Sequence, residues 1–318
     1  MASLAVGFEC AARHLSLVLL PLLLDLFLWL GPRLSLATLI ERLLALWQTM
    51  LPADSFALLA ETMQDVGARS NLFSLLSPAP LLGLPSLHAL HLAAATPWGP
   101  RVAIEVSSPL PLIGWIAVLL VAGSGLNALY LAQVGRAFRA EQDEPLPSQP
   151  STATIWRRLL ALTAFLVAVI LFVLFPLLSL VGFLSLLSTM LAFLVESFLL
   201  FSFLFALLRL IYLFPAIVLM NATFLQALRE SLTLTQLYLN QTAMLVTTMA
   251  IIEMGLNFVW TLPPATSWVR LVSLAGHAFI DTALLASLFY FYHQRLAYLA
   301  SLKRHYQAQA IHSQVKPS

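Results

Sequence analysis

The feature that most constrains this chain is an apolar run that extends from residue 186 to residue 213. Apart from serine and threonine, its polar members are Glu196 near the middle, and Arg209 and Tyr212 at the end. Because an α-helix rises about 1.5 Å per residue, about 20 residues cross a hydrocarbon core of about 30 Å. The run is therefore long enough to span a membrane, and Pro215 is expected to end it.

Five further apolar segments predict membrane spans, which makes about six in all. The charged residues are only 9% of the chain, whereas a soluble domain has about 25%. We therefore expect an all-α fold, a polytopic transmembrane helix bundle that forms a single integral membrane domain over residues 1–318. The predicted spans cover residues 15–30, 110–134, 159–180, 186–213, 240–260 and 268–292.

Three segments do not read as spans. Residues 32–109 combine amphipathic stretches with several prolines, and we expect them to lie on the membrane surface or to dip into the bundle. Residues 135–158 are polar and predict a linker, and residues 293–318 form a basic tail. The interpretation of 32–109 as an outer amphipathic or re-entrant segment leaves open whether it spans the membrane.

The distribution of positive charge predicts the orientation, because cytoplasmic loops carry an excess of lysine and arginine. An even number of spans places both termini on one side, and eleven of the 16 basic residues fall on that side. Both termini are therefore predicted to be cytoplasmic, in a protein of the cytoplasmic membrane, and residues 32–109 are predicted to lie on the outer face. The eleven residues are Arg13, Arg136, Arg139, Arg157, Arg158, Arg209, Arg229, Arg295, Lys303, Arg304 and Lys316.

A short amphipathic helix is predicted between the fourth and fifth spans. Apolar and polar residues alternate from Thr223 onward with the period of a helix, as expected for a helix at a membrane interface. Thr223 followed by Gln226 predicts a capping box at its start. We call this region the interfacial elbow, and its predicted residues are Pro215, Phe224, Leu228, Arg229 and Leu232.

The elbow carries a resemblance to a known family. The run YLFPAIVLM over residues 212–220, followed by FLQALRESLTLTQLYL over residues 224–239, resembles the membrane domain that accompanies some bacterial glycerophosphodiester phosphodiesterases, and its stand-alone relatives. The family usually has an acid after its I-V-L run, where this chain has Met220. The resemblance implies a six-helix membrane fold and no known chemistry. No segment is long and polar enough to be the soluble phosphodiesterase domain.

Five ionisable residues fall inside the predicted spans. A charged group at the middle of a span costs about 2.5–3.5 kcal/mol on insertion scales, so such residues are expected to face the bundle interior or a water-filled cavity. With the predicted orientation all five lie between the middle of the membrane and its outer half, and they form one acidic cavity if their faces converge. The five residues are Asp25, Glu196, Glu253, His277 and Asp281.

Two interpretations of this candidate polar site stay open. The five groups could bind a cation or a polar headgroup, or relay protons; one histidine with several carboxylates could also hold a divalent metal. Alternatively, the acids stay protonated and form hydrogen bonds between helices. The sequence shows no Cys/His zinc spacing, phosphate loop or G-x-S-x-G motif, so we predict no catalytic residue, metal or cofactor. Cys10 is the only cysteine, which excludes an intrachain disulfide.

The leading functional hypothesis is a non-enzymatic membrane-embedded subunit or lipid-associated scaffold, based on the resemblance and on the absence of catalytic motifs. A transporter or channel that uses an intramembrane acidic cavity is the alternative, and an intramembrane metal-dependent enzyme is the third. The expected partners are membrane lipids and other membrane subunits. A net charge of +2 gives no reason to expect nucleic acid.

Overall fold

The structure, a computed structural model, describes residues 2–50, 53–77, 83–90, 95–142 and 147–314. Most of the described chain is helical and very little of it is strand, which confirms the all-α class. Five helical segments are long and apolar enough to cross a membrane: 109–140, 152–187, 189–219, 239–261 and 270–301. The chain is therefore a polytopic helical membrane protein, in agreement with the sequence.

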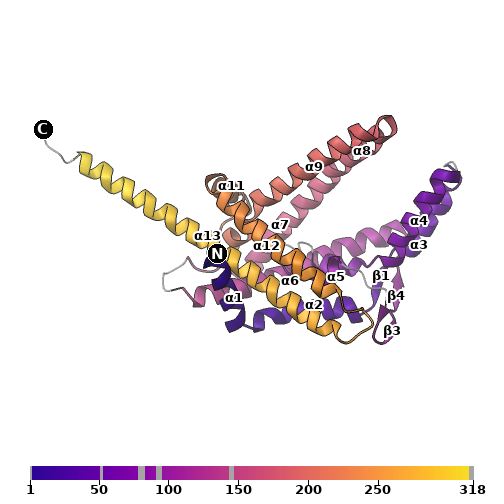
Figure 1. Cartoon of the computed structure of the whole chain (residues 1–318), viewed down its shortest axis with the longest axis horizontal. Coiled ribbons are helices and arrows are strands. Elements are labelled where there is room, and N and C mark those ends of the chain that lie inside the picture. Colours follow the sequence, from indigo (N-terminus) through magenta and orange to yellow (C-terminus); the bar gives the residue numbers. More distant parts are fainter. Residues whose placement is uncertain (1, 51–52, 78–82, 91–94, 143–146, 315–318) are drawn as a thin grey trace.

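A sixth span would be bent. Helix α1 (Ala2–Arg13) and helix α2 (Ser16–Leu30) pass the length and hydropathy criteria only as a pair, and their axes differ by 80°. Helix α1 packs along the last helix, α13 (Arg270–Gln314), as Figure 1 shows. The sequence predicted the span 15–30 but not the preceding helix. The predicted basic tail continues α13 as far as Gln314, and residues 315–318 lie outside the described residues.

The third predicted span is longer than expected, and the fourth begins and ends later, at 189–219. Helix α7 (Thr152–Val169), the π-helical turn η2 (Ile170–Leu174) and helix α8 (Phe175–Leu187) form one segment, although Pro176 lies inside it. Proline removes a backbone hydrogen bond, and a local π turn can accommodate that loss. The next helix, α9 (Thr189–Leu210), begins where the Ser188 side chain accepts a hydrogen bond from the Leu191 amide. Residues 186 and 187 therefore belong to the third span rather than to the fourth.

The α7–α9 segments project away from the rest of the molecule (Figure 1). None of the residues in the most apolar part of 152–187 is buried. Large apolar side chains such as Phe172, Phe193 and Phe201 are more than half exposed. A surface of this kind is stable only against lipid or against another membrane protein.

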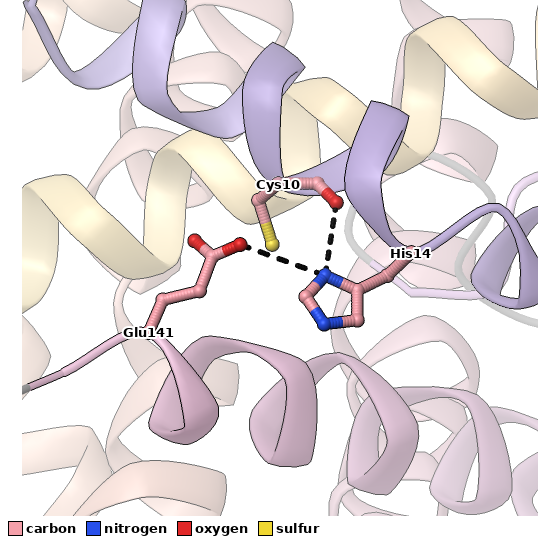
Figure 2. A group of neighbouring side chains, drawn as sticks. All are labelled: Cys10, His14 and Glu141. Atoms are coloured by element: carbon pink, nitrogen blue, oxygen red, sulfur yellow. Dashed lines mark hydrogen bonds and ion pairs between the residues drawn. The ribbon is translucent and has the colours of Figure 1, made fainter.

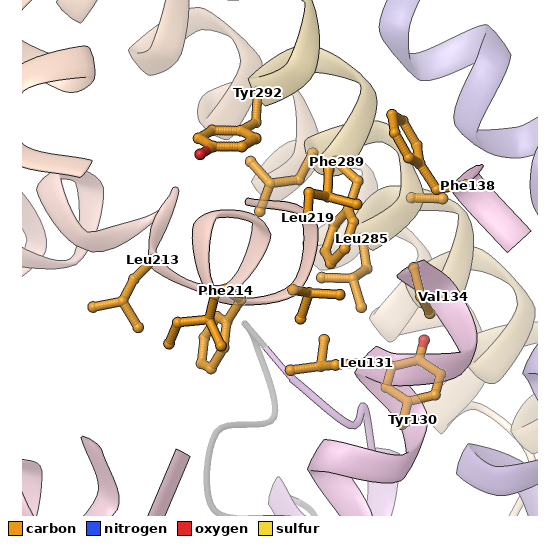
Figure 3. Close-up of a cluster of buried hydrophobic side chains, with 14 of the residues drawn as sticks. Tyr130, Leu131, Val134, Phe138, Leu213, Phe214, Leu219, Leu285, Phe289 and Tyr292 are labelled. Carbon is orange, nitrogen blue, oxygen red and sulfur yellow. The ribbon is translucent and has the colours of Figure 1, made fainter. Parts of the chain in front are cut away.

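The main core lies between helix α6 (Pro109–Ala140), helix α10 (Leu213–Leu219) and α13. Every residue of α10 is buried, so Pro215 packs into the core of the protein. Helix α6 extends six residues beyond the predicted span, into the predicted linker. Figure 3 shows this core, which includes Tyr130, Leu131, Val134, Phe138, Phe214, Leu219, Leu285, Phe289 and Tyr292.

The amphipathic helix of the elbow is α11 (Phe224–Leu237), and its predicted capping box between Thr223 and Gln226 is present. Its buried residues are Ala227, Ser231, Leu234 and Thr235, whereas the apolar residues Phe224, Leu228 and Leu232 are only partly buried and Arg229 is exposed. Ser231 Oγ donates to the Arg209 carbonyl at 2.7 Å and accepts from the Tyr212 amide at 3.2 Å. The helix thus satisfies the backbone at the end of α9 with its small polar residues.

The predicted outer segment begins with two helices and two short strand pairs. Helix α3 (Ala37–Trp47) packs against helix α4 (Ala53–Arg69). Strand β1 (Arg33–Ser35) pairs in parallel with β4 (Ala103–Glu105), and β2 (Ala95–Thr96) pairs antiparallel with β3 (Gly99–Pro100). Arg101 donates to the carbonyls of Gly31 and Pro32, just after α2, and burial beside Arg33 lowers the pKa of its guanidinium. These contacts place the segment at the end of the bundle where α2 ends.

Part of the outer segment packs into the bundle. The 3₁₀ helix η1 (Leu72–Leu76) lies on α6, and the short helix α5 (Leu87–Leu90) lies on α2. A Cβ atom on Gly123 would come within 2.6 Å of the Leu75 carbonyl oxygen, so glycine is required for this approach. Helix α12 (Leu239–Thr261) completes the bundle beside α13.

Candidate intramembrane polar site

Three of the five predicted site residues come together between α12 and α13. The His277 Nε2 atom lies 3.3 Å from the Asp281 carboxylate and 3.9 Å from the Glu253 carboxylate. His277 and Asp281 are one helical turn apart on α13, and Glu253 faces them from α12. One ligand atom from each residue lies within 4.8 Å of the others, so the group has the composition and spacing to hold a metal ion.

A buried arginine fixes how α12 packs against α13. It was not singled out in the sequence analysis. Arg270 donates to the carbonyl of Trp260 at 2.9 Å and to that of Pro263 at 3.1 Å. These carbonyls belong to the end of α12 and to the turn that follows it, where the backbone lacks helical partners. Gly276 lies against the Trp260 ring, which a Cβ atom would approach to 2.5 Å. The contacts set the register that brings Glu253 opposite His277.

A cavity of about 280 Å³ adjoins this group. Its wall consists mostly of aliphatic side chains from α9, α12 and α13, among them Leu208, Val246 and Leu284. Glu253 and Asp281 are the ionisable residues among those that line it. The arrangement is an apolar chamber with two carboxylates on its wall, next to a buried histidine.

Asp25 belongs to a separate network. It is fully buried on α2 and accepts hydrogen bonds from the Ser86 hydroxyl at 2.6 Å and from the amides of Leu87 and His88, each at 3.1 Å. The carboxylate thus holds the first turn of α5. The neighbouring residues Gly83 and Pro85 line the cavity, so the segment that binds Asp25 forms part of the cavity wall.

Glu196 does not share the site. It lies exposed on α9, on the side that also carries Phe193 and Leu200. Glu253, His277 and Asp281 therefore come together, whereas Asp25 and Glu196 lie apart from them. The depth of a residue along a span follows from the sequence, but the direction of its side chain depends on how the helix is rotated in the bundle.

A second group of side chains that could hold a metal ion was missed by the sequence analysis. Cys10, His14 and Glu141 offer three ligand atoms that lie within 4.8 Å of one another. The spacing of Cys10 and His14, one helical turn apart, was the only signal available in the sequence. Glu141 is remote in the chain and could not be connected with them.

No family model, curated protein or solved structure matches the chain. The resemblance of residues 212–239 to the membrane domain of glycerophosphodiester phosphodiesterases therefore stays a prediction.

Proposed function

We propose that the chain is a transporter of the cytoplasmic membrane that binds an amphiphilic cation in the cavity between α9, α12 and α13. The observation that carries the proposal is the pair of carboxylates, Glu253 and Asp281, on the wall of an otherwise apolar cavity. Aliphatic walls favour the apolar part of a ligand. Carboxylates in a medium of low dielectric constant favour a positive charge that compensates their own.

His277 gives this site a means of exchanging protons. Its Nε2 atom reaches both carboxylates, so one proton on the imidazole or on a carboxylate reduces the negative charge of the group. A bound cation has the same effect. We infer that cation binding and protonation compete at Glu253 and Asp281, which is the condition for exchange of a cation against protons.

The proposed orientation places both termini in the cytoplasm. Arg139 donates to the Leu219 carbonyl, Arg209 donates to the Leu232 carbonyl, and the Arg295 guanidinium lies over the Phe291 and Tyr238 rings. These cations gather around α10 and α11, whereas the β1–β4 pair lies where α2 ends. An excess of basic residues on one side supports a cytoplasmic assignment for that side.

Binding of tetraphenylphosphonium, an amphiphilic cation, tests the proposal. With the full chain in lipid nanodiscs, we expect Glu253→Gln and Asp281→Asn each to weaken binding about tenfold or more, which corresponds to about 1.4 kcal/mol. Equilibrium dialysis with labelled probe measures the affinity. Glu196→Gln is the matched control, since it removes an exposed acid from a neighbouring span, and its affinity should equal that of the unmodified chain.

Thermal unfolding of each variant checks that the fold is kept. Equal affinity in the unmodified chain and in a Glu253→Gln/Asp281→Asn double variant would refute the assignment of the cavity. Absence of any probe binding by the unmodified chain would refute the proposed ligand class.

A second candidate function is a membrane-embedded subunit, and Glu196 is the observation that favours it. An acid exposed on an apolar span costs about 2.5–3.5 kcal/mol in lipid, and a polar group on a partner helix would offset that cost. The resemblance of the elbow to a membrane domain that accompanies enzymes agrees with such a role. The projecting α7–α9 segments would then be the surface that meets the partner.

Photocrosslinking from position 193 tests the second candidate. A photoreactive amino acid in place of Phe193, one turn before Glu196 on the same face, should give a discrete protein adduct in native membranes. The same substitution at Leu19, an exposed residue of α2, is the control and should give lipid adducts. Lipid adducts alone at both positions would show that α9 faces lipid.

A further inference from the structure

The second group of metal-ligating side chains lies where α1, α6 and α13 meet. Figure 2 shows the Cys10 thiol between the His14 ring and the Glu141 carboxylate. The His14 Nδ1 atom lies 3.6 Å from Glu141 Oε1. Cys10 is fully buried, and Glu141 is largely buried directly after α6. About one third of the His14 side chain is exposed, which leaves an approach from outside.

The fold positions these three residues by contacts that do not depend on a metal. Helix α1 lies so close to α13 that Gly7 touches the α13 backbone, and the chain turns sharply at His14 before α2 begins. Tyr290 of α13 donates a hydrogen bond to Glu141 Oε2. That bond orients the carboxylate and leaves its other oxygen, Oε1, directed toward Cys10 and His14 (Figure 2).

Glu141 Oε1 is the observation that points to a ligand. It is buried, and the donor that the described residues offer it is the Cys10 thiol. A thiol is a weak donor, so this buried carboxylate oxygen is poorly satisfied, which is costly. The His14 imidazole at 3.6 Å is beyond hydrogen-bond distance.

We propose that Cys10, His14 and Glu141 bind a divalent transition metal, and that Zn²⁺ fits them best. A thiolate, an imidazole and a carboxylate are the three side-chain donors that zinc uses. Zinc binds nitrogen and oxygen at about 2.0–2.2 Å, so two donors in a tetrahedral site are about 3.4 Å apart. The 3.6 Å separation of His14 Nδ1 and Glu141 Oε1 is close to that value. Three protein ligands leave a fourth position for water or another donor.

Metal binding at this site releases protons. The Cys10 S–H bond breaks as the metal–sulfur bond forms, and the proton passes to water. The Nδ1 atom of His14 lies 3.2 Å from the Cys10 carbonyl oxygen, a contact that requires a proton on Nδ1. A neutral imidazole carries one proton, so that proton moves from Nδ1 to Nε2 when Nδ1 binds the metal, and the contact with the Cys10 carbonyl is given up. Affinity should therefore fall as the pH is lowered.

This site is distinct from the cavity of the proposed function. Tyr290 follows Asp281 by nine residues on α13, which is about 13 Å along a helix. A metal here would join α1 to the end of α6 and hold the bend between α1 and α2. The proposal does not rest on the transport function, and either could fail without the other.

Cobalt binding to the full chain in lipid nanodiscs tests the site. Co²⁺ bound to a thiolate has a sulfur-to-metal charge-transfer absorption, and Cys10 is the only cysteine of the chain, so this band reports on one site. We expect the band at one Co²⁺ per chain, its loss in Cys10→Ser, and at least about tenfold weaker Co²⁺ affinity in His14→Ala and in Glu141→Gln. Added Zn²⁺ should remove the band by displacement.

Two controls make the result specific. Glu9→Gln removes an exposed acid on α1 that pairs with Arg13, and Glu253→Gln alters the intramembrane group; neither should change the band. Absence of the band in the unmodified, folded chain overturns the proposal. A band of unchanged affinity in His14→Ala and Glu141→Gln also overturns it, because the thiol alone would then bind the metal. This second comparison stands even if Cys10→Ser fails to fold.

Discussion

Asp25→Ala is expected to lower the free energy of unfolding by at least about 3 kcal/mol. The substitution leaves the Ser86 hydroxyl and the amides of Leu87 and His88 without their acceptor in a fully buried place. Each unsatisfied buried donor costs about 1–3 kcal/mol. Reversible denaturation in mixed micelles of sodium dodecyl sulfate measures the change.

Two further variants separate this network from a general effect of charge. Asp25→Asn keeps the shape and one acceptor oxygen, so it should cost less than Asp25→Ala. Asp65→Asn removes an exposed carboxylate that pairs with Arg69 on α4, and its cost should stay below about 1 kcal/mol. If Asp25→Ala were no more destabilising than Asp65→Asn, the α2–α5 network would not contribute to the fold.

Gly7→Ala is expected to destabilise the protein by about 1–3 kcal/mol or more, the usual cost of overpacking. A Cβ atom at this position would lie 2.1 Å from Ser287 Oγ and 2.5 Å from the Ala283 carbonyl oxygen. The carbonyl belongs to the backbone of α13 and cannot rotate away, so α1 must move off α13. The fall in the melting temperature of the purified chain measures the loss.

Gly114→Ala is the matched control, since a Cβ atom on Gly114 meets nothing within 4 Å. Replacing glycine by alanine inside a helix without a clash stabilises by roughly 0.5–1 kcal/mol, so the two substitutions should have opposite signs. Adding Ser287→Gly to Gly7→Ala should not restore stability, because the Ala283 carbonyl remains in the way. Full recovery in that double variant would show that only the serine side chain opposes α1.

The sequence predicted the helical segments well because the length of each apolar run shows directly whether it can span a membrane. The runs 110–134 and 240–260 lie within helices that are long enough to span a membrane, and so does 268–292 from residue 270 onward. It could not predict the 80° bend between α1 and α2 or the uninterrupted passage through Pro176. Both depend on how neighbouring turns and helices compensate for the lost backbone hydrogen bonds, and no local sequence pattern indicates how they do so.

The buried face of α11 shows what apolar periodicity leaves open in a membrane protein. Its pattern predicted a surface helix with Phe224, Leu228 and Leu232 on one side, and in the structure Ala227 and Ser231 are among the residues that face the bundle. Lipid is as apolar as leucine, so helix contacts in membranes favour small and polar residues. The periodicity identified a helix and its start but not the side that packs.

The candidate site, too, was predicted only in part from the sequence. The sequence named Glu253, His277 and Asp281 because ionisable residues inside spans are rare and costly, and the turn spacing joined the last two. Opposition of Glu253 to His277 needed the register that Arg270 sets between α12 and α13. Contacts between residues remote in the chain, such as Asp25 with Ser86 or Cys10 with Glu141, leave no trace in a single sequence.

The uninterrupted course of α13 has a consequence for how the molecule could be regulated. One helix carries Asp281 on the cavity wall, His277 one turn before it, and Tyr290 beside Glu141 further along, without a proline or glycine between them. A continuous helix transmits a tilt or rotation from one end to the other. If an ion bound at either site favours one orientation of α13, each bound ion changes the affinity of the other site by the same factor, because binding equilibria that share a conformational change are reciprocal.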